Sequence, residues 1–303
     1  DMSFTDYAQG AMVVGFSLIP ADLDIASNGR IFVAHDADTP TVVYGMNIAS
    51  NMGTISYSPF ARALAMDRDA NRTVEGRVGP VIQKNILYIA TSSGLAYSVL
   101  ADSEGNTIPT APFALSLPQF FVITGMDVDP WTHHLYLAGY INDGNFQYPR
   151  LIEYDPYYAD DDTQTYGQVL NTITEADCPA FRSLQDVIVK DSGVFVLNVV
   201  PLLDKTTPIL LRFDSNLSYQ GGFGNVSSDA AGRQLIESIA PGDFYRPKRF
   251  FAQENPGLYI IDDSTSTFDK VVYISESLDP ASWRTFTNEE LGELGQFSFS
   301  FVD

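Results

Sequence analysis

A short pattern of strands and turns recurs along this chain, and it limits the folds that the chain can adopt. The clearest copy is residues 123–156, ITGMDVDPWTHHLYLAGYINDGNFQYPRLIEYDP. Its apolar and aromatic runs predict three strands, Gly125–Asp129, His134–Gly139 and Arg150–Asp155. Asp-Pro and Asn-Asp-Gly sequences separate these runs and favour tight turns.

Four other segments repeat the order of a first strand, a turn, an apolar second strand, a loop and an aromatic third strand. Their second strands are expected at Arg30–Ala34, Leu87–Ala90, Val194–Leu197 and Leu258–Ile261. The copies recur at roughly 45–60 residues, a period typical of β-propeller blades. A twisted four-stranded sheet has two faces to bury, and radial packing of blades buries both while leaving only short edges.

The repeat therefore predicts an all-β chain in which residues 1–303 form a single β-propeller domain of five to six four-stranded blades. Strands at 11–18 and 297–302 are expected to close the propeller from the two termini. An apolar content of 45%, with 13% aromatic residues, is sufficient for the large core that this fold requires.

The chain is strongly acidic, with 38 acidic residues, 17 lysines and arginines, and a net charge of −21. This charge repels phosphate backbones and anionic lipids, so we expect neither nucleic-acid binding nor binding to a membrane surface. No run approaches the ~18 apolar residues of a membrane span. The single cysteine, Cys178, excludes an intrachain disulfide and a Cys-x-x-Cys metal site.

Several of the repeats resemble the six-bladed propellers of the NHL, SMP-30 and YncE-like superfamily. The matching segments are DLDIASNGRIFVAHD, GMDVDPWTHHLYLAG, DVIVKDSGVFVLN and FFAQENPGLYIIDD. The resemblance implies the propeller fold and an extracytoplasmic location, whether periplasmic, secreted or on a surface lipoprotein. No export signal is expected within the chain itself, because its first residues, DMSFTDYAQG, lack a basic stretch. Whether a signal or a lipid anchor has been removed stays open.

Loops that join second to third strands gather on one face of a propeller, where binding groups are usually placed. Two of these loops begin with acidic residues, and a third, YINDGNFQYP, mixes amides, acids and aromatics. They predict an anionic mouth suited to a small molecule, a carbohydrate or a divalent cation. The alternative is that aspartate and asparagine only stabilise the turns. The candidate residues are His35, Asp36, Asp38, Tyr140, Asn142, Asp143, Asp262 and Asp263.

A separate calcium site is suggested by Asp67, Asp69 and Asn71, which have the alternate spacing of oxygen ligands in calcium-binding loops. The sixth position of that motif is Arg72 instead of glycine, and the twelfth is Val78 instead of an acidic residue. An ordinary surface turn is the alternative.

Two functions of different classes fit these observations. The first is a non-catalytic propeller that binds a ligand or a protein partner, since no convergent catalytic set is recognisable. The second is a divalent-metal-dependent hydrolase of the lactonase or esterase type, with acidic residues of the mouth as ligands and His35 as base. A third, a redox quinoprotein, rests on one segment, GPVIQKNILYIATSSGLAYSVLADSEG. The hydrolase ligands would come from Asp36, Asp38, Asp262 and Asp263.

Overall fold

The computed structural model divides the chain into two compact units. The first unit comprises residues 9–147 and 152–172, and the second comprises residues 1–8, 148–151 and 173–303. The single domain expected over the whole chain stays a prediction. The predicted terminal strands lie outside the residues that the structure describes. Those residues are 20–25, 31–35, 42–45, 53–55, 61–68, 85–91, 94–101, 108–109, 113–160, 162–163, 165–201, 204–228, 238–251, 256–265 and 268–287.

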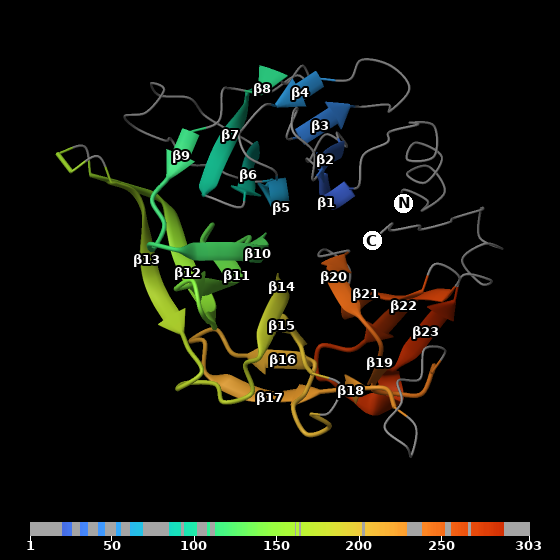
Figure 1. Cartoon of the computed structure of the whole chain (residues 1–303). Helices are drawn as coiled ribbons and strands as arrows, with labels where there is room; N and C mark the ends of the chain where they lie inside the picture. Colours follow the sequence, from blue (N-terminus) through green and yellow to red (C-terminus); the bar gives the residue numbers. More distant parts are fainter. Residues whose placement is uncertain are drawn as a thin grey trace. The chain divides into compact units, whose positions relative to one another are not determined.

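The fold is a β-propeller, and its four-stranded sheets are antiparallel meanders in which neighbouring strands are consecutive in sequence (Figure 1). The strands predicted between residues 125 and 155 are confirmed, and each is longer than the pattern indicated. One sheet of the first unit contains β1 (Pro20–Ile25), β2 (Ile31–His35), β3 (Val42–Gly45) and β4 (Gly53–Ile55). Another contains β10 (Phe121–Val128), β11 (Leu135–Asn142), β12 (Gln147–Asp160) and β13 (Thr165–Ile173).

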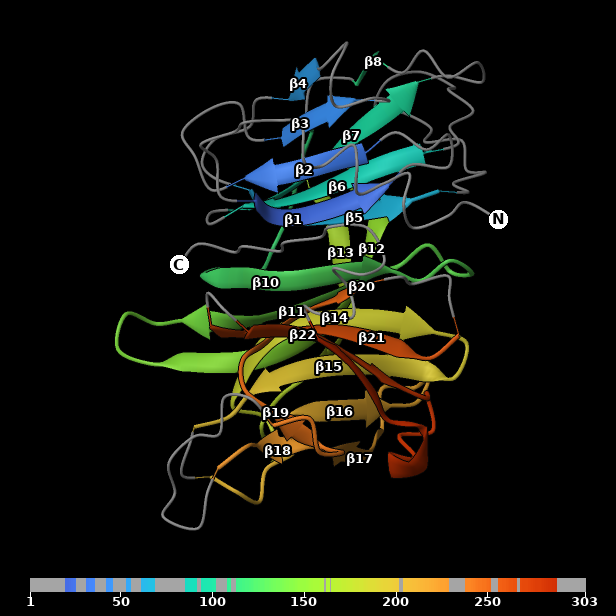
Figure 2. The same ribbon diagram turned by 90° about the vertical axis from the view of Figure 1, so that its right-hand side faces the viewer.

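The second unit contains two further four-stranded sheets, and Figure 2 shows the strands of the first of them side by side. That sheet consists of β14 (Ser183–Lys190), β15 (Gly193–Val199), β16 (Leu210–Phe213) and β17 (Tyr219–Phe223). The other consists of β20 (Pro247–Phe251), β21 (Leu258–Thr265), β22 (Phe268–Ile274) and β23 (Arg284–Thr287). The described part of this unit also contains a short parallel pair, β18 (Asn225–Val226) and β19 (Asp243–Phe244), and a 3-10 turn, η1 (Pro280–Ser282). Within the described residues, no helix is long and apolar enough to cross a membrane.

The described residues form four four-stranded blades, so the prediction of five to six is wrong. The remaining repeat forms a five-stranded sheet, in which β7 pairs with β8 at one end and with β9 at the other. Pro109 ends β8 and Pro112 precedes β9, and a proline has no backbone N–H for a continuous ladder. The strands are β5 (Ala61–Asp67), β6 (Asn85–Thr91), β7 (Leu95–Ala101), β8 (Ile108–Pro109) and β9 (Phe113–Leu115).

The first strand of each of these sheets contains a β-bulge near its start, so the repeats share this feature. In two sheets an aspartate follows the bulge and binds the first strand of the next sheet in its own unit. Asp22 accepts a hydrogen bond from Leu64 N at 2.8 Å, and Asp186 accepts one from Phe250 N at 2.8 Å. These aspartates therefore link consecutive sheets. The register is interrupted after Pro20, Ala61, Ile123, Leu184 and Pro247.

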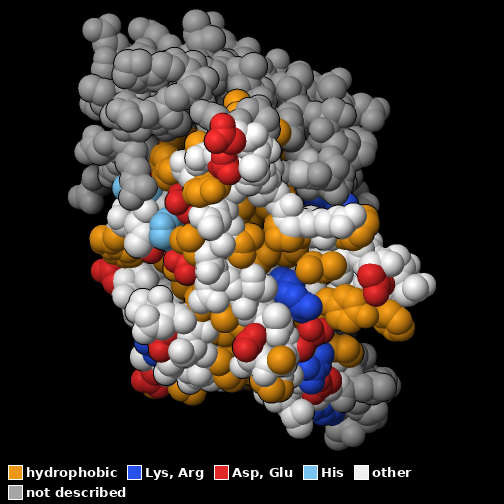
Figure 3. All heavy atoms as spheres, turned by 90° about the vertical axis from the view of Figure 1, so that its left-hand side faces the viewer, with side chains coloured by type: hydrophobic (Ala, Val, Ile, Leu, Met, Phe, Trp, Pro, Cys, Tyr) orange, Lys and Arg blue, Asp and Glu red, His pale blue; other side chains and the backbone are white. Residues whose placement is uncertain are grey.

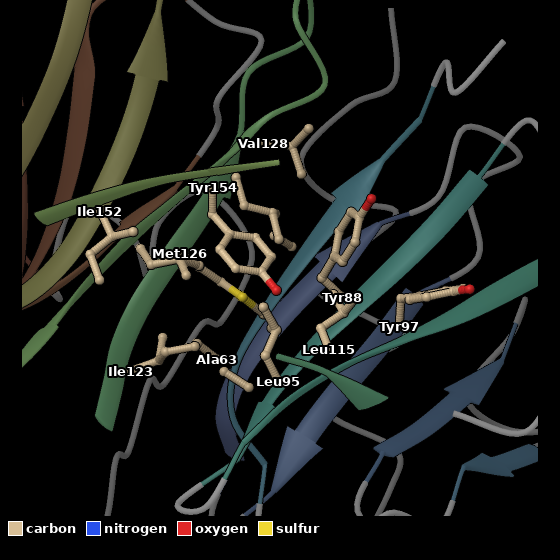
Figure 4. Packing of buried hydrophobic residues seen from close by; sticks show 14 of the residues in the cluster. Ala63, Tyr88, Leu95, Tyr97, Leu115, Ile123, Met126, Val128, Ile152 and Tyr154 are labelled. Atoms are coloured by element: carbon tan, nitrogen blue, oxygen red, sulfur yellow. The ribbon is translucent and has the colours of Figure 1, made fainter. Parts of the chain in front are cut away.

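Aromatic and aliphatic side chains from several strands form the core of the first unit. Figure 4 shows Tyr154 of β12, Met126 of β10 and Tyr88 of β6 in one cluster. The Tyr154 hydroxyl donates to the carbonyl oxygen of Ser116 at 2.5 Å, so this buried ring fixes the segment that precedes β10. The second unit has a core of its own, in which the rings of Phe244 and Phe223 pack against Trp283.

Candidate functional site

Two phenylalanines are exposed beside the β11–β12 hairpin. Phe120, directly before β10, is 63% exposed, and Phe146, in the turn between β11 and β12, is 65% exposed. Large exposed aromatic side chains are characteristic of surfaces that bind partners. On the face of the molecule in Figure 3, hydrophobic side chains are exposed between polar ones. We name residues 117–120 and 142–146 the hairpin surface.

The backbone holds both phenylalanines in place. Phe120 has a φ of 62°, which non-glycine residues rarely adopt, and its carbonyl oxygen accepts a hydrogen bond from Asn142 N at 3.0 Å. The Asp143 carboxylate accepts hydrogen bonds from Asn145 N at 2.9 Å and Phe146 N at 2.8 Å. Asp143 N in turn donates to the Phe146 carbonyl oxygen at 3.3 Å. The turn is thus closed by its own groups, and both aromatic rings are presented from a defined backbone.

A hollow of about 450 Å³ is lined in part by Phe120, and its walls expose apolar and polar surface in similar proportion. Gln119 and Asn142 contribute side-chain amides to its lining. Asn142 Oδ1 accepts a hydrogen bond from Gly144 N at 3.0 Å, but its Nδ2 and the Gln119 carboxamide have no hydrogen-bond partner among the described residues. Carboxamides donate and accept hydrogen bonds, as peptide groups do. The apolar lining comes from Leu115, Leu117, Pro118, Phe121 and Val122.

Part of the predicted mouth coincides with this surface. Tyr140, Asn142 and Asp143 lie at the end of β11 and in the turn that follows it, and Asn142 also lines the hollow. The role of these residues as a ligand site stays a prediction. The candidates whose side chains lie outside the described part of the chain are His35, Asp36, Asp38 and Asp263.

Asp262 has a structural role instead of lying in an open mouth. It is fully buried in β21, and its carboxylate accepts hydrogen bonds from Tyr245 N at 2.9 Å and Arg246 N at 2.6 Å. The buried Lys270 Nζ lies 3.3 Å from the same carboxylate. Burial raises the pKa of Asp262 above its ordinary value, although the lysine and both amide donors act in the opposite direction. Asp262 is therefore not available as a metal ligand for the hydrolase alternative.

Asp67 lies neither in an exposed calcium loop nor in a surface turn, the two alternatives that the sequence left open. It is the last residue of β5 and is 2% exposed. Its carboxylate accepts a hydrogen bond from the Tyr157 hydroxyl at 2.8 Å and lies 3.0 Å from His133 Nδ1. Asp69 and Asn71 lie outside the described residues, and inside them no three acidic, histidine or cysteine side chains form a group that could hold a metal ion.

The sequence pattern did not identify Phe120 or Phe146 as site residues, although it contained a signal. Turns normally carry polar residues, glycine and proline. Phe146 directly follows an Asn-Asp-Gly-Asn turn sequence, and Phe120 directly precedes the phenylalanine that begins β10. An aromatic residue at a turn position has no core face available to it, which indicates exposure.

Comparisons with known proteins concern the fold and identify no family. No family model matches the chain, and no curated protein sequence matches it. The GH74 enzyme of Niastella koreensis is similar over 91% of this chain, with 11% identity and a TM-score of 0.51, but this chain covers 38% of that one. A chain of the nidogen/laminin complex is similar over 86% of this chain and 78% of its own, with 12% identity and a TM-score of 0.49. The Dos1 propeller is similar over 84% of this chain and 68% of its own, with 9% identity and a TM-score of 0.44.

Proposed function

We propose that this protein is a non-catalytic binding module whose hairpin surface holds an extended segment of a partner protein. The observation that carries this proposal is the exposure of Phe120 and Phe146 on a hydrogen-bonded backbone, with a hollow beside Phe120 that apolar side chains line in part. Binding energy at protein interfaces is concentrated in a few anchors, among which aromatic side chains are frequent. Anchors that are already fixed lose little conformational entropy when the partner binds.

The chemistry of the surface indicates what the partner segment contains. The apolar part of the hollow fits a hydrophobic side chain, and the carboxamides of Gln119 and Asn142 match the backbone amides on either side of it. The net charge of −21 attracts a partner that carries lysines or arginines near this segment. We therefore expect an extended peptide with one large apolar residue and basic neighbours.

The test is a selection of displayed random peptides on the purified full chain, followed by affinity measurements on synthetic peptides from the selection. The double variant Phe120→Ala/Phe146→Ala should bind them at least about tenfold more weakly, since each anchor contributes on the order of 1–2 kcal/mol. Leu170→Ala is the matched control, because Leu170 lies on β13 of the same unit and is 45% exposed. It should leave the affinity unchanged.

Two outcomes of the peptide selection would contradict the proposal. Peptides that bind the double variant and the wild type equally well would show that the hairpin surface is not the binding site. Selected sequences without an apolar residue would contradict the chemistry assigned to the hollow. Both phenylalanines are exposed, so the free energy of unfolding of the double variant should equal that of the wild type to within about 0.5 kcal/mol.

We also propose that the chain groups with the NHL, SMP-30 and YncE-like propellers and works outside the cytoplasm. The repeat segments that resemble this superfamily support the proposal. Fractionation of cells that produce the natural protein tests the location, and recovery in the cytoplasmic fraction alone would contradict it.

A further inference from the structure

The second unit contains a hollow of about 370 Å³ that is lined by other residues than the hairpin surface. Two aromatic side chains of its lining, Tyr219 and Phe223, come from β17, and the acidic side chain, Asp243, comes from β19. Pro208 and Pro241 contribute apolar surface. The combination of aromatic rings and one carboxylate suggests a specific ligand chemistry.

The carboxylate of Asp243 has no basic partner among the described residues. It accepts hydrogen bonds through Oδ2 from the hydroxyls of Ser227, at 3.2 Å, and Ser238. The nearby Lys270 Nζ donates to the main-chain carbonyl oxygen of Asp243 at 2.8 Å and lies 3.3 Å from Asp262. The Asp262–Lys270 pair carries no net charge, whichever partner holds the proton. Among the residues that the structure describes, one negative charge is therefore left uncompensated at the hollow.

The aromatic side chains are fixed by packing. The Tyr219 ring lies 5.6 Å from the ring of Phe213, and the Phe223 ring lies 5.8 Å from that of Trp283, measured between ring centroids. Tyr219 is nevertheless 37% exposed, so part of it remains open to a ligand. Aromatic faces attract organic cations, and more strongly when the cation leaves water.

We infer that this hollow binds an organic cation of the guanidinium or ammonium type, and we name Tyr219, Phe223 and Asp243 the cation pocket. Asp243 supplies the opposite charge, and the two rings supply cation–π attraction. A single carboxylate falls far short of the roughly six to eight oxygens that Ca²⁺ requires, so a calcium ion does not fit. Arginine and lysine side chains of a peptide, and free polyamines, share the chemistry that does fit.

Isothermal titration calorimetry on the full chain tests the inference with two probes, N-acetyl-arginine amide and spermidine. Asp243→Asn keeps the shape of the side chain and removes its charge, and it should weaken the binding of both probes at least about tenfold. Asp191→Asn is the matched control, because Asp191 is exposed and lies outside the pocket, and its substitution changes the net charge by the same amount. Its effect should be about twofold or less.

A second pair of variants keeps the test decisive when Asp243→Asn does not fold. Tyr219→Phe preserves the aromatic face and should bind as the wild type does, whereas Tyr219→Leu should bind several-fold more weakly. Tighter binding of the arginine derivative indicates a peptide side chain as the natural ligand, and tighter binding of spermidine indicates a polyamine; either order supports the pocket. Absence of binding to the wild type, or equal losses in Asp243→Asn and Asp191→Asn, overturns it.

Discussion

His133 Nδ1 lies 3.0 Å from each carboxylate oxygen of Asp67, so two residues that are 66 positions apart are joined inside the first unit. His133 reaches this position from a left-handed backbone, with a φ of 61°, in the turn between β10 and β11. The Tyr157 hydroxyl, at 2.8 Å, is a second donor to this buried carboxylate. The contact joins the five-stranded sheet, through β5, to the sheet that contains β10 and β12.

The first prediction concerns this contact. His133→Ala should lower the free energy of unfolding by about 1–3 kcal/mol, because it leaves a buried carboxylate short of a donor. His134→Ala is the control, since His134 is paired with Glu153 at 3.0 Å and both side chains are more than one-fifth exposed. It should cost less than about 1 kcal/mol. Urea denaturation measures both, and equal losses would show that the Asp67 contact contributes no more than a surface pair.

The second prediction is a loss of stability at alkaline pH. Burial raises the pKa of Tyr88 well above its ordinary value of 10.0, and the hydrogen bond to Tyr157 and the charge of Asp67 act in the same direction. A group with a raised folded-state pKa contributes stability that is complete below its unfolded pKa and is lost as the pH rises toward the folded value. The free energy of unfolding should therefore decrease above about pH 10.

Tyr88→Phe identifies the group responsible, because phenylalanine fills the same volume and cannot ionise. Its free energy of unfolding should fall less steeply than that of the wild type between about pH 9.5 and 11. At neutral pH the variant should be modestly less stable, since the hydrogen bond to Tyr157 is lost. The idea is wrong when the two alkaline slopes, obtained from urea denaturation at each pH, are the same.

The strand pattern could be predicted from the sequence where strands are long and regularly apolar. The second strands β6, β15 and β21 were placed correctly, because each contains a continuous apolar run, which is ILYIA, VFVL and LYII respectively. The outer strands were harder. Strand β17, YQGGF, contains two glycines, and β23, RTFT, is only 4 residues long, so neither carries a strong strand signal. The number of blades was predicted wrongly because the outer strands could not be recognised.

Only local turn chemistry could be predicted from the sequence at the candidate site. Asn142 and Asp143 were named because they belong to a recognisable turn, and the structure places them in that turn, while their role as ligand residues stays a prediction. Asp67 was misplaced because its partners, His133 and Tyr157, are 66 and 90 residues away. Asp262 was misplaced for the same reason, since a sequence does not reveal that Tyr245, Arg246 and Lys270 surround its carboxylate.

The third prediction separates two costs of replacing glycine in the first unit. Gly144 and Gly167 both have positive φ, 93° and 83°, so alanine strains the backbone at either position. A Cβ at Gly144 would meet nothing within 4 Å, whereas one at Gly167 would lie 1.8 Å from the Tyr154 hydroxyl. Gly144→Ala should cost about 1 kcal/mol and Gly167→Ala at least about 3 kcal/mol. Thermal denaturation compares them, and equal shifts would contradict the close approach.

The fourth prediction concerns the buried pair Asp262–Lys270 of the second unit, whose side chains are 0% and 1% exposed. Lys270→Met keeps an unbranched side chain of similar length but leaves the carboxylate without its counter-charge and two carbonyl oxygens, of Ser238 and Asp243, without a donor. It should lower the free energy of unfolding by about 3–5 kcal/mol. Arg150→Met is the control for an ion pair near the surface, since its partner Glu175 is 42% exposed, and it should cost less than about 1 kcal/mol.

The double variant Asp262→Asn/Lys270→Met decides whether charge is the cause of that loss. Asparagine can still accept the hydrogen bonds from Tyr245 N and Arg246 N through its carbonyl oxygen, and it has no charge to be compensated. Because the main penalty in Lys270→Met is an unpaired buried charge, removing that charge should restore part of the stability. Urea denaturation of the wild type, the two single variants and the double variant forms the cycle. A double variant that is less stable than Lys270→Met alone would show that packing, and not charge, determines the requirement for lysine at this position.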